Sequence, residues 1–138
     1  PDGRTMYFAD SFDRRILAFD FDVNSGTPGA GRSLAVFPNP GGVPDGATVD
    51  AAGFLWIAIY GGGCLHRYAP DGRLDRSVPL PMSQPTSCAF GGSDLDVLYV
   101  TSAFQHMSDV ARAREPLAGA IIGIDVGVRG LPEPAFVG

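Results

Sequence analysis

The sequence predicts an all-β chain that forms about three blades of a β-propeller. Three apolar segments of similar pattern recur along it, MYFAD, LWIAI and LYVTS. Equivalent residues are 49 positions apart from Tyr7 to Trp56 and 43 apart from Trp56 to Tyr99. A repeat of roughly 40 to 50 residues built from short strands is typical of propeller blades. Three blades are fewer than the about four to eight that close a propeller ring.

The composition fits this fold and excludes some classes of partner. The 138 residues are 45% hydrophobic, which is enough for a core, and the 19 Gly and 12 Pro suit many short strands joined by tight turns. A formal net charge of −5 gives no basic surface for nucleic acid or an anionic membrane. No apolar run approaches the ~18 residues of a membrane span. We therefore expect no nucleic-acid partner and no membrane partner.

Two cysteines, Cys64 and Cys88, are too few for a disulfide framework. Both lie in predicted strands, so we expect buried free thiols in a reducing, cytoplasmic location. No secretory signal is present, and because the chain begins at Pro1 rather than methionine, an upstream segment is one expectation.

The predicted blades cover residues 1–38, 43–81 and 85–138. The first blade lacks its inner strand, because Pro1-Asp2-Gly3 resembles the turn that follows such a strand. The predicted strands of the second blade are 46–50, 54–59, 64–68 and 74–80. Those of the third are 87–90, 97–102, 120–125 and 134–137, with a helix-compatible stretch at 108–115 in its long loop.

Strand direction predicts which loops share a face. Inner strands begin on one face, here called the top face. The loops predicted on it are 10–14, 38–45, 60–63, 81–86 and 103–119. Function in propellers usually resides in such loops over the central channel.

Pro-Asp-Gly occurs three times, and its aspartates are not equivalent. Asp2 and Asp71 lie in predicted hairpin turns, where Asp stabilises the turn. Asp45 lies where the chain crosses between blades, so its carboxylate faces the mouth of the channel. Position alone leaves two roles open for Asp45, a turn former or a metal ligand and base. A lone carboxylate cannot hold a divalent cation, which needs several ligands.

Other polar residues give weaker signals. His106 has no partner at metal-ligand spacing, and His66 alternates with apolar neighbours in a strand, so we interpret both as structural or solvated. Trp56 is expected in the core, and the Arg14-Arg15 pair on a solvated face. The hydroxyl residues on the top face have no nearby histidine and form no nucleophilic triad.

Three segments carry a family resemblance: PDGxTMYxADS from Pro1, VPDGxxVDAxGxLWIA from Val43, and PTSCAFGGxDLxxLYVTSA from Pro85. They resemble the senescence marker protein/gluconolactonase (regucalcin-type) family across essentially the whole chain. The resemblance implies a six-bladed propeller of which this chain is the C-terminal half.

The resemblance also implies metal-dependent hydrolysis of sugar lactones to aldonic acids. The family holds one divalent cation (calcium, zinc, magnesium or manganese) through a Glu, an Asn and an Asp, and the Asp falls on Asp45, which would be both metal ligand and base. Asp10, Tyr60 and Thr86 are expected near the rim of the pocket by topology. The Glu and the Asn belong to the part of the family that precedes Pro1, so this chain carries only part of the site.

Three interpretations remain open at this point. The chain is the C-terminal half of a lactonase that needs its missing N-terminal half, or a half-propeller whose copies pair as a homodimer to close the ring. The third is a non-catalytic half-propeller that self-associates as a metal-binding or interaction module. The sugar lactone is the expected small-molecule partner only in the first two.

Overall fold

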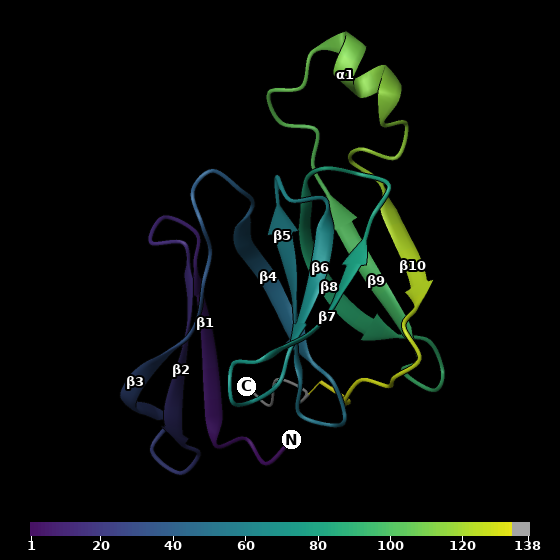
Figure 1. Ribbon diagram of the computed structural model, residues 1–138. Helices are drawn as coiled ribbons and strands as arrows, with labels where there is room; N and C mark the ends of the chain where they lie inside the picture. The colour runs from purple at the N-terminus through teal and green to yellow at the C-terminus, as the bar shows by residue number, and fades with distance from the viewer. Residues whose placement is uncertain (134–138) are drawn as a thin grey trace.

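The computed structural model describes residues 1–133, whose strands form three antiparallel sheets (Figure 1). The first sheet contains β1 (Thr5–Asp10), β2 (Arg15–Asp22) and β3 (Thr27–Val36). The second contains β4 (Val43–Val49), β5 (Leu55–Tyr60), β6 (Cys64–Tyr68) and β7 (Leu74–Pro79). The third contains β8 (Pro85–Gly91), β9 (Val97–Ser102) and β10 (Ile121–Asp125). The predicted all-β architecture is confirmed.

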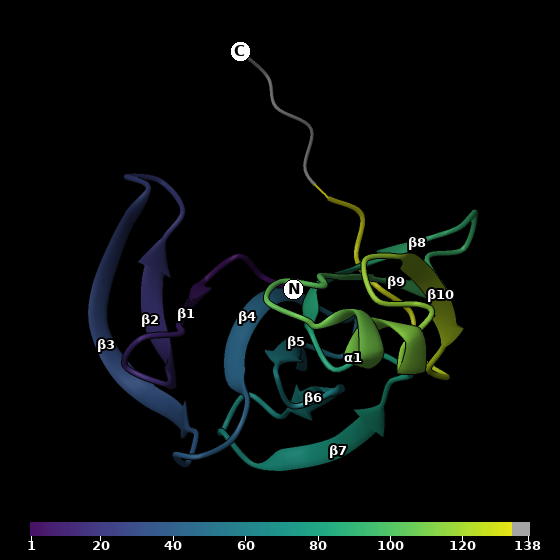
Figure 2. The ribbon, with the colours of Figure 1, turned by 90° about the horizontal axis from the view of Figure 1, so that it is seen from above.

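The sheets stand side by side in an arc, as Figure 2 shows from above. Strands β1, β4 and β8 lie toward the inside of the arc, and β3, β7 and β10 lie on its outside. Each sheet is a simple meander, because antiparallel neighbours follow one another along the chain. The strand predicted at 134–137 lies outside the described residues, so the third sheet has three strands among them.

The only helix among residues 1–133 is α1 (Asp109–Arg114), within the stretch predicted to be helix-compatible. Ser108 caps its N-terminus by accepting a hydrogen bond from the Ala111 N–H at 3.2 Å. Within the described part of the chain, no helix has the length and apolar character needed to cross a membrane.

Two turns use the aspartates that the sequence singled out for them, one before β1 and one between β6 and β7. The Asp2 Oδ1 atom accepts from the Arg4 N–H at 3.0 Å, and Asp71 does the same for Arg73 at 3.0 Å. Gly72 supplies the positive φ of 89° that the second of these turns requires. The structural interpretation of these two aspartates is confirmed.

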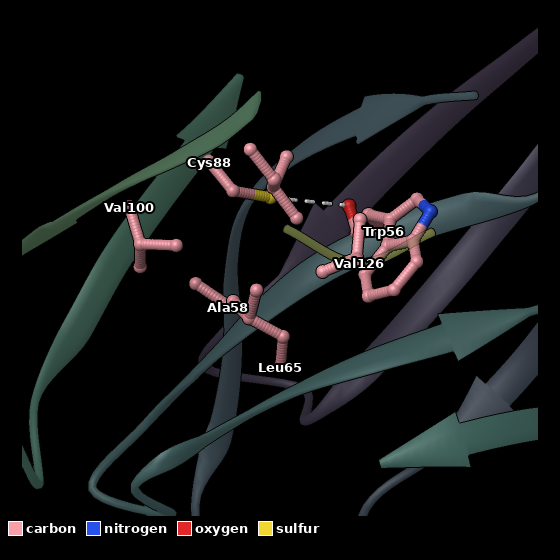
Figure 3. Packing of buried hydrophobic residues seen from close by; sticks show 7 residues of the cluster. Trp56, Ala58, Leu65, Cys88, Val100 and Val126 are labelled. Carbon is pink, nitrogen blue, oxygen red and sulfur yellow. Dashed lines mark hydrogen bonds between the residues drawn. The ribbon is translucent and has the colours of Figure 1, made fainter. Parts of the chain in front are cut away.

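One hydrophobic core joins the second and third sheets (Figure 3). Trp56 and Ala58 of β5 face Cys88 and Val100 across it, and all four are buried. The Cys88 thiol lies 3.6 Å from the Trp56 carbonyl oxygen, to which it donates. The core therefore confirms the predicted burial of Trp56 and of one of the two cysteines, while Cys64 is half-buried.

This burial predicts very different thiol reactivity at the two cysteines. Burial raises the pKa of the Cys88 thiol to about 12. Because the thiolate is the nucleophile, roughly one Cys88 in ten thousand is ionised at about pH 8. We expect Ellman's reagent to modify Cys64 in the native protein and Cys88 only after unfolding. The control is Cys64→Ser, in which Cys88 is the remaining thiol. Equal rates of modification at the two thiols would contradict the burial of Cys88 in this core.

A second core joins the first and second sheets around an aromatic group. The His66 ring stacks on Phe37 with centroids 6.1 Å apart, and its Nδ1 lies 3.1 Å from the Tyr68 hydroxyl. The interpretation of His66 as a hydrogen-bonded structural histidine is confirmed. Burial lowers the pKa of His66, because the charged imidazolium would lose its water.

The lowered His66 pKa predicts acid sensitivity of the fold. The unfolded chain binds a proton at His66 near its ordinary pKa of about 6.5, whereas the folded chain binds it only at lower pH. The free energy of unfolding should therefore fall as pH drops below about 6.5. Urea unfolding at neutral and mildly acidic pH measures this, and His66→Gln should show the smaller loss. An equal loss in both proteins would assign the sensitivity to other groups.

A buried ion pair joins the strands at the bottom of the second sheet. The Asp50 carboxylate is fully buried and accepts from the Ala52 and Phe54 N–H groups at 2.9 and 3.0 Å and from the Trp56 indole at 2.9 Å. Arg67 donates to it through Nε and Nη2 at 2.8 and 2.7 Å, and through Nη1 to Asp75 at 2.7 Å. Both carboxylate oxygens of Asp50 thus accept hydrogen bonds, and the Arg67 charge balances its own, as a buried carboxylate requires.

Candidate functional site

The loops predicted to share the top face are linked to one another by hydrogen bonds. The Ser11 hydroxyl donates to the Pro44 carbonyl at 2.7 Å, which ties the first sheet to the second. The Ser83 N–H donates to the Glu115 carboxylate at 2.7 Å, which ties the loop before β8 to the end of α1. Helix α1 stands over this end of the sheets in Figure 1. Four of the five predicted top-face loops are therefore linked in two pairs.

An open hollow of about 560 Å³ lies in this face. It is lined by Asp45, Tyr60, Thr86 and residues 103–106. Three of the four predicted site residues are thus brought together from β4, β5 and β8. The fourth, Asp10, does not line this hollow. Its Oδ1 atom accepts from the Asp13 N–H at 2.9 Å and closes the turn after β1.

Asp45 and Thr86 occupy equivalent positions, because each lies at a β-bulge. Between the pairs Pro44–Ile59 and Ala47–Ile57, the β4 strand has one residue more than β5. In β8, Thr86 is the extra residue between the pairs Pro85–Ser102 and Ser87–Thr101. A bulge turns a side chain out of the regular alternation of a strand, and bulges are over-represented beside active sites.

Glycines on both sides of Asp45 allow the backbone to come close to its neighbours. A Cβ atom on Gly42 would lie 2.7 Å from the Gly62 nitrogen. A Cβ atom on Gly46 would lie 2.8 Å from the Ser87 Cα, so β4 and β8 nearly touch at this point. No side chain fits at either position without moving backbone, so Asp45 is held in a fixed place.

We expect Gly46→Ala to separate β4 from β8 and to lower the free energy of unfolding by about 1–3 kcal/mol. The obstacle is the backbone of Ser87, which cannot move aside as a flexible side chain can. Gly29→Ala in β3 is the matched control, because its Cβ would make only an ordinary contact 3.4 Å from the Asp20 carbonyl. Urea unfolding of both variants measures the difference. Equal stability would show that the strands are not in close contact.

Asp45, Tyr60 and Thr86 bring oxygen atoms to the hollow, and the other lining residues are Ala103, Phe104, Gln105 and His106. The Thr86 and Thr101 hydroxyls are 2.8 Å apart, and Thr101 donates its one proton to the Ser87 carbonyl at 3.4 Å. The two hydroxyls share one hydrogen bond, and Thr86 keeps lone pairs for a ligand. Partial burial raises the pKa of the Asp45 carboxyl, which makes its carboxylate a better proton acceptor. Such polar groups suit a ligand with hydroxyl groups.

The described residues do not by themselves fit a divalent cation. Among residues 1–133, no group of three or more His, Cys, Asp or Glu side chains is arranged to hold a metal ion. Asp45 supplies one carboxylate to the hollow, and the hydroxyls of Tyr60 and Thr86 are neutral. A cation at this position would need further ligands from outside the described part of the chain.

A family model for the SMP-30/gluconolactonase/LRE-like region matches residues 1–104. The chain belongs to this family. Regucalcin of Xenopus laevis is 39% identical over 139 residues, which cover 99% of this chain and 46% of that protein. A protein of Rhizobium meliloti described as a putative sugar lactone lactonase is 39% identical over 138 residues. The match covers 99% of this chain and 47% of that protein.

A solved structure agrees with the sequence comparison. The crystal structure of a calcium-binding protein, regucalcin, from Agrobacterium tumefaciens superposes with a TM-score of 0.91 at 35% identity. The match covers 97% of this chain and 46% of that one. This SMP-30/gluconolactonase chain therefore spans about half the length of the relatives it matches. The likeness confirms the predicted fold class of about three blades of a six-bladed propeller.

Sequence patterns do not single out Arg14, a residue in the turn after β1 on this face. It is half-buried rather than fully solvated, and its guanidinium binds the carbonyls of the crossover that leads to Asp45. The neighbouring Arg15 pairs instead with the exposed Asp13 at 2.6 Å. Arg14 has a φ of 53°. A positive φ is usually indicated by glycine, so an arginine at this position does not predict it.

Proposed function

We propose that this chain supplies one part of a site that hydrolyses sugar lactones to aldonic acids. The observation that carries the proposal is the position of Asp45, at a bulge in an open hollow, in a chain of the SMP-30/gluconolactonase family. Its relatives include a putative sugar lactone lactonase. Asp45, Tyr60 and Thr86 place polar oxygen atoms in the hollow, which can hydrogen-bond to the hydroxyl groups of a sugar.

In the proposed reaction, Asp45 acts as a general base. Its carboxylate accepts a proton from water as the water oxygen bonds to the lactone carbonyl carbon. The bond from that carbon to the ring oxygen then breaks, and the proton passes to the ring oxygen, which leaves as a hydroxyl group. Thr86 accepts a hydrogen bond from a substrate hydroxyl and orients the ring. The raised pKa of Asp45 favours this proton transfer near neutral pH.

We further propose that the reaction depends on one divalent cation, with Asp45 as one of its ligands. A similar structure is that of a calcium-binding protein, regucalcin. Calcium, zinc, magnesium and manganese all accept carboxylate oxygen. Such a cation, when bound, would polarise the lactone carbonyl. Its other ligands would come from outside the described residues.

The first sheet indicates where the completing polypeptide would bind. Among the described strands β1 pairs only with β2, so its other edge is open. Beside that edge lies a hollow of about 430 Å³, lined in part by Thr5 and Tyr7 of β1 and Val49 of β4. An open edge takes up a further strand readily. We propose that a strand of a missing N-terminal half, or of a second copy of this chain, pairs there.

The two reduced thiols fit a cytoplasmic location for the assembly.

The experiment is hydrolysis of D-glucono-1,5-lactone, followed as proton release above the spontaneous rate. The chain is assayed alone and co-expressed with the part of the Agrobacterium tumefaciens regucalcin that it does not match, each with calcium, zinc, magnesium or manganese and with EDTA. We expect EDTA-sensitive hydrolysis in the assembly. No hydrolysis in an assembly that has formed would contradict the proposed function, and hydrolysis unaffected by EDTA would remove the cation from it.

A further inference from the structure

The crossover from the first to the second sheet is fixed by a single side chain, that of Arg14. Its Nη2 donates to the carbonyls of Pro38, Gly41 and Gly42, the last two at 2.9 and 3.0 Å. Its Nε lies 3.4 Å from the Phe37 carbonyl. Because Nη2 has only two N–H groups, these three carbonyls share them, and together with the Nε contact the guanidinium reaches both ends of the crossover.

The backbone of Arg14 is part of the same arrangement. Its carbonyl accepts from the Phe37 N–H at 2.8 Å, so Arg14 and Phe37 are bonded in both directions. Its φ of 53° lies in the left-handed region, which costs free energy for a residue other than glycine. A conformation of this kind persists where the surrounding contacts determine it, and here those contacts are the crossover carbonyls.

The crossover leads directly to the proposed base. Gly42, which Arg14 binds, is three residues before Asp45. Pro44, immediately before Asp45, accepts from the Ser11 hydroxyl at 2.7 Å. The turn after β1 therefore holds the approach to Asp45 at two points, although none of its residues lines the hollow. Residues 38–41 are exposed at the surface.

We propose that Arg14 is a positioning residue, which fixes the crossover so that Asp45 points into the hollow. The inference rests on the proposed function of Asp45 as a base. The guanidinium acts through hydrogen-bond geometry rather than through its charge, since it binds neutral carbonyls. The same positive charge on Arg15 does not serve this purpose, because Arg15 turns away to Asp13.

The test compares Arg14 with Arg15 in the assembled protein. Arg14→Gly removes the side chain and fits the left-handed φ, and Arg14→Lys keeps the charge but has one nitrogen in place of Nε and Nη2. With D-glucono-1,5-lactone, we expect both variants to lower kcat by about 100-fold, the cost of an ångström-scale displacement of a catalytic group, while KM changes little. Arg15→Ala and Arg15→Lys should retain kcat. Millimolar guanidinium should restore part of kcat in Arg14→Gly alone.

A second readout does not need activity. Amide hydrogen exchange at Gly42 and Gly46 should accelerate by on the order of tenfold in Arg14→Gly and stay unchanged in Arg15→Ala, since only the first loses the crossover bonds. If the wild-type assembly hydrolyses no lactone, the proposed function fails, and exchange alone decides whether Arg14 positions this segment. Unchanged exchange, or full kcat in both Arg14 variants, would overturn the inference.

Discussion

Replacing Asp45 by asparagine is expected to lower lactone hydrolysis by about 10²- to 10⁴-fold, the range that a general base contributes. The amide has nearly the shape of the carboxylate but cannot accept the proton of water, and it is a weaker cation ligand. Because burial raises the pKa of Asp45, its charge costs free energy in the folded state, and Asn removes that cost. Thermal unfolding should therefore be unchanged or slightly higher.

The matched control is Asp71→Asn, in the other internal Pro-Asp-Gly sequence. Asp71 lies at the opposite end of the second sheet, where its Oδ1 closes the turn before β7. The Asp71→Asn variant should retain lactone hydrolysis. Retained hydrolysis in Asp45→Asn would remove Asp45 from the mechanism. A large loss of hydrolysis in Asp71→Asn would mean that the catalytic site lies at the opposite end of the sheets, where Asp71 is.

Asp50→Ala is expected to have the largest effect on stability, a loss of about 3–5 kcal/mol in the free energy of unfolding. The variant leaves the Arg67 guanidinium buried with only Asp75 as a charged partner. Burial lowers the pKa of Arg67, but Asp75 and Asp50 outweigh it and raise that pKa, so the arginine stays charged and its lost partner is costly. The Trp56 indole N–H also loses its acceptor.

Asp75→Asn is the control for Asp50→Ala, because its carboxylate shares the same arginine but is 26% exposed. Water replaces an exposed partner at little cost, so this variant should lose much less stability. Urea unfolding of the two variants measures the contrast. Similar losses would show that the Arg67 charge depends on both carboxylates equally and that burial of Asp50 has no special role.

The strands and the grouping of site residues were predictable because both follow from local patterns. Apolar segments such as LWIAI alternate with glycine-rich turns, which predicts strands and their direction. Direction alone places the start of β4, the end of β5 and the start of β8 on one face, and so predicts that Asp45, Tyr60 and Thr86 come together. All three of these residues line the hollow in the structure.

The features that the sequence does not reveal depend on register and long-range contact. The bulges at Asp45 and Thr86 arise from how β4 and β8 pair with their neighbours, and an extra residue in a strand has no distinct composition. Asp50 and Arg67 are 17 residues apart and meet only after β4, β5 and β6 have paired. Arg14 and Arg15 are alike in sequence, and only the backbone turn at Arg14 separates their roles.

The most direct test of the account measures lactone hydrolysis across the fractions of a sizing column run in line with light scattering. The sample is the chain with its completing polypeptide, and each fraction receives D-glucono-1,5-lactone and a divalent cation. Because Asp45 is one part of a site whose other ligands lie outside the described residues, activity should appear only in fractions heavier than the 14.4 kDa chain. Equal activity per chain in the 14.4 kDa fraction would contradict the account, since the single chain would then carry a complete site.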